Sequence, residues 1–154
     1  MGLGPKLLVA GEDLYRQINP NFIQEGRVSG QAFTPTRKDL SLLSVDQSSL
    51  TTAEASFELF TTGLNLRSAG IYGVTVGEAS GVGLDSYSNP LPSNPAHAVV
   101  DFRNLSNGQT QNKGSKLAAI ARDKGPKYWP AQAVPEVPVT ISVARNDAPL
   151  LGDG

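Results

Sequence analysis

The chain has 154 residues and a formal net charge of -1, with 16 Gly, 11 Pro and no Cys. This length corresponds to about one domain and is enough to enclose one sizeable core. The near-neutral charge excludes a general attraction to nucleic acid or anionic lipid. The lack of Cys excludes a disulfide scaffold, a thiolate metal site and a Cys nucleophile.

Turn residues and alternation divide the first third of the chain into short strands. Residues 1–12 are expected to form an arm or a short edge strand. Residues 14–18 are a predicted strand because they alternate well enough, and residues 40–45 are the next predicted strand. Residues 21–38 are predicted to be a long loop or a pair of very short strands, and residues 46–49 a turn.

A capped helix follows this turn. Thr51 and Glu54 have the spacing of a capping box, in which a hydroxyl and a carboxylate satisfy unpaired amides at the helix start. Ala53, Phe57 and Phe60 recur at helical spacing and predict one buried stripe. Gly63 is placed to end the helix.

The second half of the chain adds two strands and a second main helix. Residues 69–76 are rich in β-formers and apolar on both faces, which predicts a central strand. Residues 77–83 are a Gly-rich turn with at most one helical turn, and residues 85–95 form a surface loop. Residues 97–102 are a predicted strand and residues 113–124 a predicted helix.

This order of elements predicts a single α+β domain with a mixed or mostly antiparallel sheet and two main helices. We expect an N-terminal arm over residues 1–12, the domain over residues 13–130 and a Pro/Val-rich extension over residues 131–154. Residues 137–143 have strand propensity, which favours docking of the extension on a partner or on a sheet edge.

Positive charge is concentrated in one segment. Residues 103–128 hold six Lys or Arg and one acid, Asp123. The candidate binding residues surround the apolar stripe of the second helix: Lys113, Lys116, Arg122 and Lys124. They predict either a phosphate or nucleic-acid contact or an ordinary solvated helix face. The solvated face is the favoured interpretation, because the segment offers few aromatic side chains on which bases could stack.

His97 is the only histidine of the chain, so any Ser-His-Asp or His-metal site depends on it alone. It begins a predicted strand, where a structural role is the commoner one. The Gly-rich turn at residues 77–83 lacks the Lys-Ser/Thr pair of a phosphate loop. We therefore expect no metal site and no resident cofactor, and His97 remains a weak catalytic candidate.

One set of polar residues resembles the arrangement of ADP-ribosyltransferases. These enzymes use an Arg or His, a Ser or Thr and a Glu in chain order to hold a nicotinamide dinucleotide. Arg16, then Ser29 or Thr34, then Glu78 match that order. The resemblance implies a dinucleotide contact, a positioning hydroxyl and an electrostatic catalyst, and requires that the three side chains converge. The favoured interpretation is that Arg16 forms a salt bridge and that Glu78 caps a helix.

Longer blocks resemble a family of short bacterial proteins to which no activity is attached. The matching blocks are LYRQINPNFIQEGRVSGQAFTPTRKD, LSVDQSSLTTAE, YGVTVGE and NPAHAVVDF. The resemblance spans about residues 13–128 and implies a bacterial single domain.

We expect the protein to act through binding. The leading hypothesis is a cytoplasmic, non-enzymatic accessory or protein-interaction module in a larger assembly or a defence or toxin system. Its partner would be another protein, with self-association or partner contact through the extension. A membrane partner is not expected, because no apolar run approaches the ~20 residues of a transmembrane helix.

Overall fold

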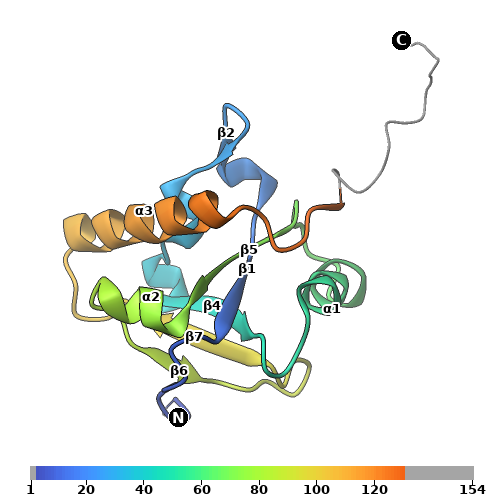
Figure 1. Ribbon diagram of the computed structural model, residues 1–154, viewed down its shortest axis with the longest axis horizontal. Coiled ribbons are helices and arrows are strands. Elements are labelled where there is room, and N and C mark those ends of the chain that lie inside the picture. Colours follow the sequence, from blue (N-terminus) through green and yellow to red (C-terminus); the bar gives the residue numbers. More distant parts are fainter. Residues whose placement is uncertain (1–2, 131–154) are drawn as a thin grey trace.

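An antiparallel sheet of five strands forms the centre of the structure, a computed structural model that describes residues 3–130 (Figure 1). Its spatial order is β5-β1-β4-β7-β6, and every printed pair is antiparallel. The strands are β1 (Asp13–Gln17), β4 (Leu42–Gln47), β5 (Ile71–Thr75), β6 (Ser86–Ser88) and β7 (His97–Asp101). The predicted α+β class with a mostly antiparallel sheet is confirmed.

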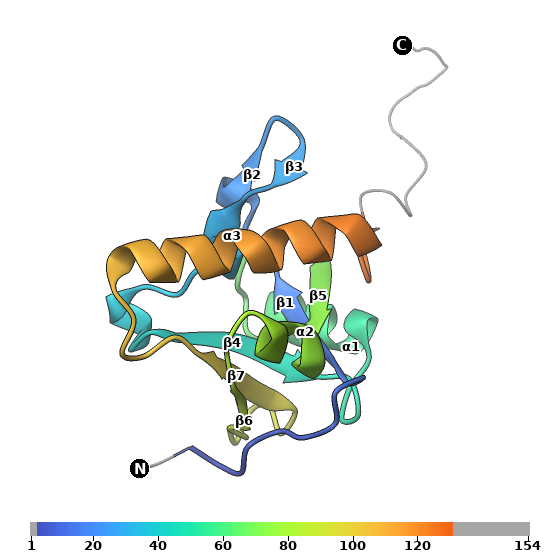
Figure 2. The same cartoon turned by 60° about the vertical axis from the view of Figure 1, so that its left-hand side comes forward.

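Helices lie on both sides of this sheet. Helices α2 (Val76–Gly81) and α3 (Asn107–Lys124) lie on one side, and α1 (Ala53–Glu58) lies on the other (Figures 1 and 2). Helix α1 continues into a π-helical turn, η4 (Leu59–Gly63). The remaining elements are three 3-10 turns and a small hairpin: η1 (Pro20–Phe22), β2 (Ile23–Gln24), β3 (Arg27–Val28), η2 (Gly30–Phe33) and η3 (Arg37–Asp39).

The main core fills the space between the sheet and α3. Strand β4 shows how the alternation of a strand assigns its residues to two environments. Leu43 and Val45 are buried in the core, whereas Ser44 between them is exposed on the opposite face. Fully buried side chains from the other elements complete the core: Leu14, Phe33, Val74, Ala98, Val100, Phe102, Leu117, Ala118 and Ala121.

Both ends of the sheet are covered by other parts of the described chain. The N-terminal segment pairs with β6, because the Gly4 amide donates to the Ser88 carbonyl at 2.8 Å. At the other end, the Ile71 amide of β5 donates to the Tyr128 carbonyl at 2.8 Å. The prediction that this apolar strand is central is therefore wrong. Its second face is apolar because the segment after α3 packs there.

Two predicted boundaries and one predicted loop are also corrected. Strand β4 begins at Leu42 rather than residue 40, because Leu40 and Ser41 have left-handed φ angles of 58° and 59°. Helix α3 begins at Asn107 rather than residue 113, because Ser106 forms a capping box with Gln109. Strand β6 lies within the predicted loop at residues 85–95.

The cap of α1 differs from the predicted one by a single residue. Thr52, not Thr51, accepts the hydrogen bond, from the Ala55 amide at 3.1 Å. The expected stripe of Ala53, Phe57 and Phe60 is only partly buried. The most buried residue of α1 is Ser56, and Phe57 instead packs against Tyr128 with ring centroids 5.3 Å apart. Ser56 lies on the same face of the helix as this stripe, and an apolar pattern misses it because its contacts, with Asp46 and Gln17, are polar.

A glycine on α3 allows this helix to pack closely on η2. A Cβ atom at Gly114 would lie 1.9 Å from Thr34 Oγ1 and 3.1 Å from the Phe33 carbonyl oxygen. The first distance is far below any contact that real Cβ atoms show, so the helix or η2 would have to move. At Gly108 of the same helix, a Cβ atom would meet nothing within 4 Å.

We predict that Gly114→Ala lowers the free energy of unfolding by about 2 kcal/mol, because overpacking a close contact costs more than the gain in helix propensity. Gly108→Ala is the matched control and should leave stability unchanged or slightly raised. Urea unfolding of both variants, followed by circular dichroism, measures the difference. Equal midpoints would show that α3 does not pack against η2 as described.

Candidate functional site

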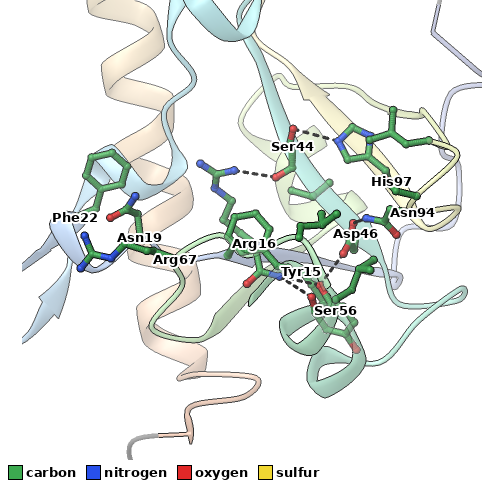
Figure 3. Close-up of a pocket in the computed structure, with 17 residues that line it drawn as sticks. Tyr15, Arg16, Asn19, Phe22, Ser44, Asp46, Ser56, Arg67, Asn94 and His97 are labelled. Carbon is green, nitrogen blue, oxygen red and sulfur yellow. Dashed lines mark hydrogen bonds between the residues drawn. The ribbon is translucent and has the colours of Figure 1, made fainter. Parts of the chain in front are cut away.

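The pocket richest in converging polar side chains lies on the α1 side of the sheet. Its cavity volume is about 330 Å³, within the range of roughly 300–1,000 Å³ for small-molecule sites. Strands β1, β4 and β7 form its floor, α1 and η4 form one wall, and the loop before β7 forms another (Figure 3). Seventeen residues line it, most of them polar on the floor and apolar on the wall.

A buried carboxylate organises one part of the floor. Asp46 is 8% exposed and accepts hydrogen bonds at both oxygens. Ser56 Oγ donates to Oδ2 at 2.6 Å, and Asn94 Nδ2 donates to Oδ1 at 2.8 Å. Gln17 Nε2 donates in turn to Ser56 Oγ at 3.1 Å. This network joins β1, β4, α1 and the loop before β7, so the carboxylate fixes the pocket walls and has its lone pairs largely occupied.

Arg16 fills a gap between two strands of the floor. Strands β1 and β4 pair at only two positions, Leu14 with Gln47 and Tyr15 with Asp46, and then diverge. Beyond that point, Arg16 Nη1 donates to the Ser44 carbonyl at 3.0 Å and Nε donates to the Ala32 carbonyl at 2.7 Å. The side chain thus replaces the backbone partner that β1 no longer supplies.

This guanidinium is partly buried and is charged at neutral pH. Burial lowers the pKa of Arg16 from 12.5 to about 10, and the charge of Asp39 opposes this shift. Two of its five N–H groups have partners among the described residues, and the others remain for a ligand.

His97 bridges the loop before β7 and strand β4. Its Nδ1 lies 2.8 Å from the Asn89 carbonyl oxygen, and its Nε2 lies 3.1 Å from Ser44 Oγ. A carbonyl oxygen only accepts, so Nδ1 carries the proton. In the neutral ring, Nε2 is then the acceptor for the Ser44 hydroxyl. Figure 3 shows Ser44 with the His97 ring on one side and the Arg16 guanidinium on the other.

Another part of the lining is apolar, and a cation lines the pocket as well. Leu59, Phe60 and Leu64 come from η4 and the residue after it, and Leu91 and Phe22 complete the apolar lining. Arg67 lies at the same end of the pocket as Asn19 and Phe22 (Figure 3). It is exposed and has no hydrogen bond or ion pair with any residue between 3 and 130.

The candidate residues from the resemblance to ADP-ribosyltransferases do not line one pocket. Arg16 is in the pocket described above, whereas Ser29 lies beside Arg122 and Thr34 packs against α3. Glu78 closes the capping box of α2 with Thr75. The convergence that this hypothesis requires is not seen among the described residues.

Most cations of the basic segment hold the fold together. Lys113 Nζ donates to the Val82 carbonyl, Arg122 Nη1 donates to the Val28 carbonyl at 2.8 Å, and Lys124 Nζ lies 2.6 Å from Glu78 Oε1. Of the four candidate binding residues, Lys116 alone is exposed with no partner in residues 3–130. These contacts fix α3 to α2 and to the β2–β3 hairpin, and they occupy the donors that a phosphate would need.

Sequence reasoning missed Ser44, Asp46, Ser56 and Asn94. A signal for two of them exists in β4, where Ser44 and Asp46 alternate with the buried Leu43 and Val45. Polar residues at every second position of such a strand indicate a second, polar environment on its other face. No local pattern indicates Ser56 or Asn94, because they meet Asp46 only through the tertiary fold.

We predict that Ser56→Ala lowers the free energy of unfolding by about 2 kcal/mol, since a buried carboxylate loses a hydroxyl donor. Ser80→Ala on α2 is the matched control. This serine is exposed, and its replacement has the same effect on helix propensity. Chemical unfolding of both variants gives the comparison. If both change stability equally, the Asp46 network contributes nothing.

A second prediction concerns pH. Partial burial alone would raise the pKa of Glu78, but hydrogen bonds from Lys124 and Thr75 and the Lys124 charge outweigh it and hold this pKa below its usual 4.5. A carboxylate with a lowered pKa in the folded state stabilises the fold above about pH 4.5, and this contribution disappears as the pH falls through the folded pKa.

Glu78→Gln should therefore lower the free energy of unfolding at pH 7 by less than about 1 kcal/mol, because the ion pair is partly exposed. As the pH falls below 4.5, the difference between the variant and the original protein should shrink, and it should vanish once the pH is below the folded-state pKa. Thermal unfolding at pH 7, 5 and 3.5 measures this. A difference that is constant across pH would contradict the assigned ion pair.

No group of three or more potential metal ligands is found in residues 3–130, and no helix there is long and apolar enough to cross a membrane. In comparisons with family models, curated proteins and solved structures, the chain has no significant match. Its function is therefore argued from the pocket itself.

Proposed function

We propose that this domain acts through binding, and that its pocket takes a small organic acid with an apolar body. The observation that carries this proposal is the imbalance of free charge in the pocket. Asp46, the acid of the lining, accepts hydrogen bonds at both oxygens. Arg16 and Arg67 retain N–H donors without a partner in residues 3–130. A pocket with spare cationic donors and occupied acceptors favours an anion.

The apolar wall supports a ligand that is more than a bare anion. Leu59, Phe60 and Leu64 line the same cavity as the polar floor. Burying apolar ligand surface contributes roughly 25 cal/mol per Å², and the charged head then supplies orientation and specificity. A carboxylate beside the two arginines, with its chain along this wall, satisfies both parts of the lining.

The expected role as an accessory or interaction module is compatible with such a pocket. The predicted strand at residues 137–143, through which a protein partner was expected to bind, lies outside the described residues. The pocket therefore supplies the observation on which a binding function rests, and its ligand is a small molecule rather than a strand.

We predict that octanoate binds in this pocket and that Arg67→Gln weakens it about 3- to 10-fold, while 1-octanol, with the same chain and no charge, is unaffected by the substitution. Arg37→Gln is the matched control, because Arg37 is an exposed arginine that does not line this pocket. Titrations followed by ¹H–¹⁵N NMR report both the affinity and the place of binding.

The amides of Ser44, Asp46 and His97 should shift on addition of octanoate. Shifts confined to other parts of the domain would place the ligand elsewhere. Equal affinity of octanoate for the original protein and for Arg67→Gln would contradict the proposal that Arg67 binds the carboxylate of the ligand.

A further inference from the structure

The pocket contains a hydroxyl and a base in the relative positions that nucleophilic catalysis requires. Ser44 Oγ lies 3.1 Å from His97 Nε2, and the opposite nitrogen of the ring is held 2.8 Å from a backbone carbonyl. The carbonyl at Asn89 plays the part of the orienting group, because it fixes the tautomer in which Nε2 is free to accept a proton.

The solvent exposure of Ser44 and a neighbouring positive charge also favour a nucleophilic role for its hydroxyl. Ser44 is exposed, whereas its neighbours Leu43 and Val45 are buried, so its hydroxyl faces the cavity and not the core. Arg16 binds the main-chain carbonyl of this same serine at 3.0 Å. A positive charge therefore lies next to Ser44, on the side away from His97 (Figure 3).

We propose that Ser44 is an acyl-accepting nucleophile and His97 its general base, and that the pocket cleaves an ester or thioester of an apolar acid. This inference rests on the proposed function for its substrate class, since the acid product is the ligand argued above. The apolar wall holds the acyl chain, and the carbonyl carbon lies at Ser44.

The step balances with water as the co-reactant. Ser44 Oγ attacks the ester carbonyl carbon while Nε2 of His97 takes the hydroxyl proton. The tetrahedral oxyanion collapses, the bond from carbon to the leaving oxygen or sulfur breaks, and His97 returns the proton to the leaving group. Water then attacks the acyl-serine by the same route and releases the carboxylic acid and the free hydroxyl.

A fluorophosphonate reagent tests the nucleophile directly on the full chain, with the modified residue identified by mass spectrometry. We expect a single adduct on Ser44 that is lost in S44A and retained in S80A. H97Q should slow labelling about 100-fold, the lower end of the usual contribution of a general base. No adduct, or adducts spread over several serines at similar rates, would overturn the proposal.

A thiol variant tests the pair without depending on the stability of H97Q alone. The chain has no Cys, so S44C carries its only thiol. Beside an imidazole base, this thiol should react with iodoacetamide at pH 7 at least about 10-fold faster than the exposed thiol of S80C. The double variant S44C/H97Q should lose that advantage. Equal rates for S44C and S80C would show that His97 does not activate position 44.

The two proposals fail separately. Octanoate binding in the pocket without labelling of Ser44 would leave the binding function standing and remove the catalytic pair. Labelling of Ser44 without octanoate binding would keep the catalytic pair and assign it to a different acyl group.

Discussion

The pocket side of the sheet depends on one interruption, the early divergence of β1 from β4. Two registered pairs join these strands before they separate, and the guanidinium of Arg16 then takes the Ser44 carbonyl. A cation in a strand ladder costs desolvation, which is why burial lowers its pKa. The hydrogen bonds to two carbonyls offset that cost. The sheet therefore has a gap between β1 and β4 that the charged Arg16 side chain lines. A continuous ladder of backbone hydrogen bonds between these strands would leave a flat surface instead.

The alternation of strand β4 places its apolar side chains on the core face of the sheet and its polar side chains on the pocket face. Its odd-numbered residues Leu43 and Val45 are buried in the core beneath α3, and its even-numbered residues Ser44 and Asp46 supply polar side chains to the pocket. Asp46 acts inside the pocket as a structural residue, because both of its oxygens are bonded. Ser44 is the member of the pair whose side chain stays open to solvent. One strand thus supplies a wall of the core, the organiser of the pocket and its most accessible hydroxyl.

The parts of this structure that could be predicted from sequence are those fixed by local patterns. The α+β class, a helix ended near Gly63 and the small hairpin within residues 21–38 follow from turn residues and periodicity. The cap of α1 lies one residue from the predicted one, because Thr51 and Thr52 offer the same hydroxyl at the helix start. The pocket could not be predicted, because Ser56 and Asn94 reach Asp46 from residues 10 and 48 positions away. Arg16 and His97 are candidates from the sequence, but their hydrogen-bond partners in the structure could not be predicted from the spacing of residues along the chain.

The double role of Arg16 limits what its replacement could reveal. Removing it would leave the Ala32 and Ser44 carbonyls without their donor, so a loss of binding or turnover would be indistinguishable from a loss of the strand gap. Arg67 has no such bond within residues 3–130, and Ser44 contributes its backbone rather than its side chain to that contact. Substitutions at these two positions change the charge and the hydroxyl of the pocket while the interaction that shapes it stays in place. The ligand charge and the acyl chemistry are therefore separable from the fold at Arg67 and Ser44, and at Arg16 they are not.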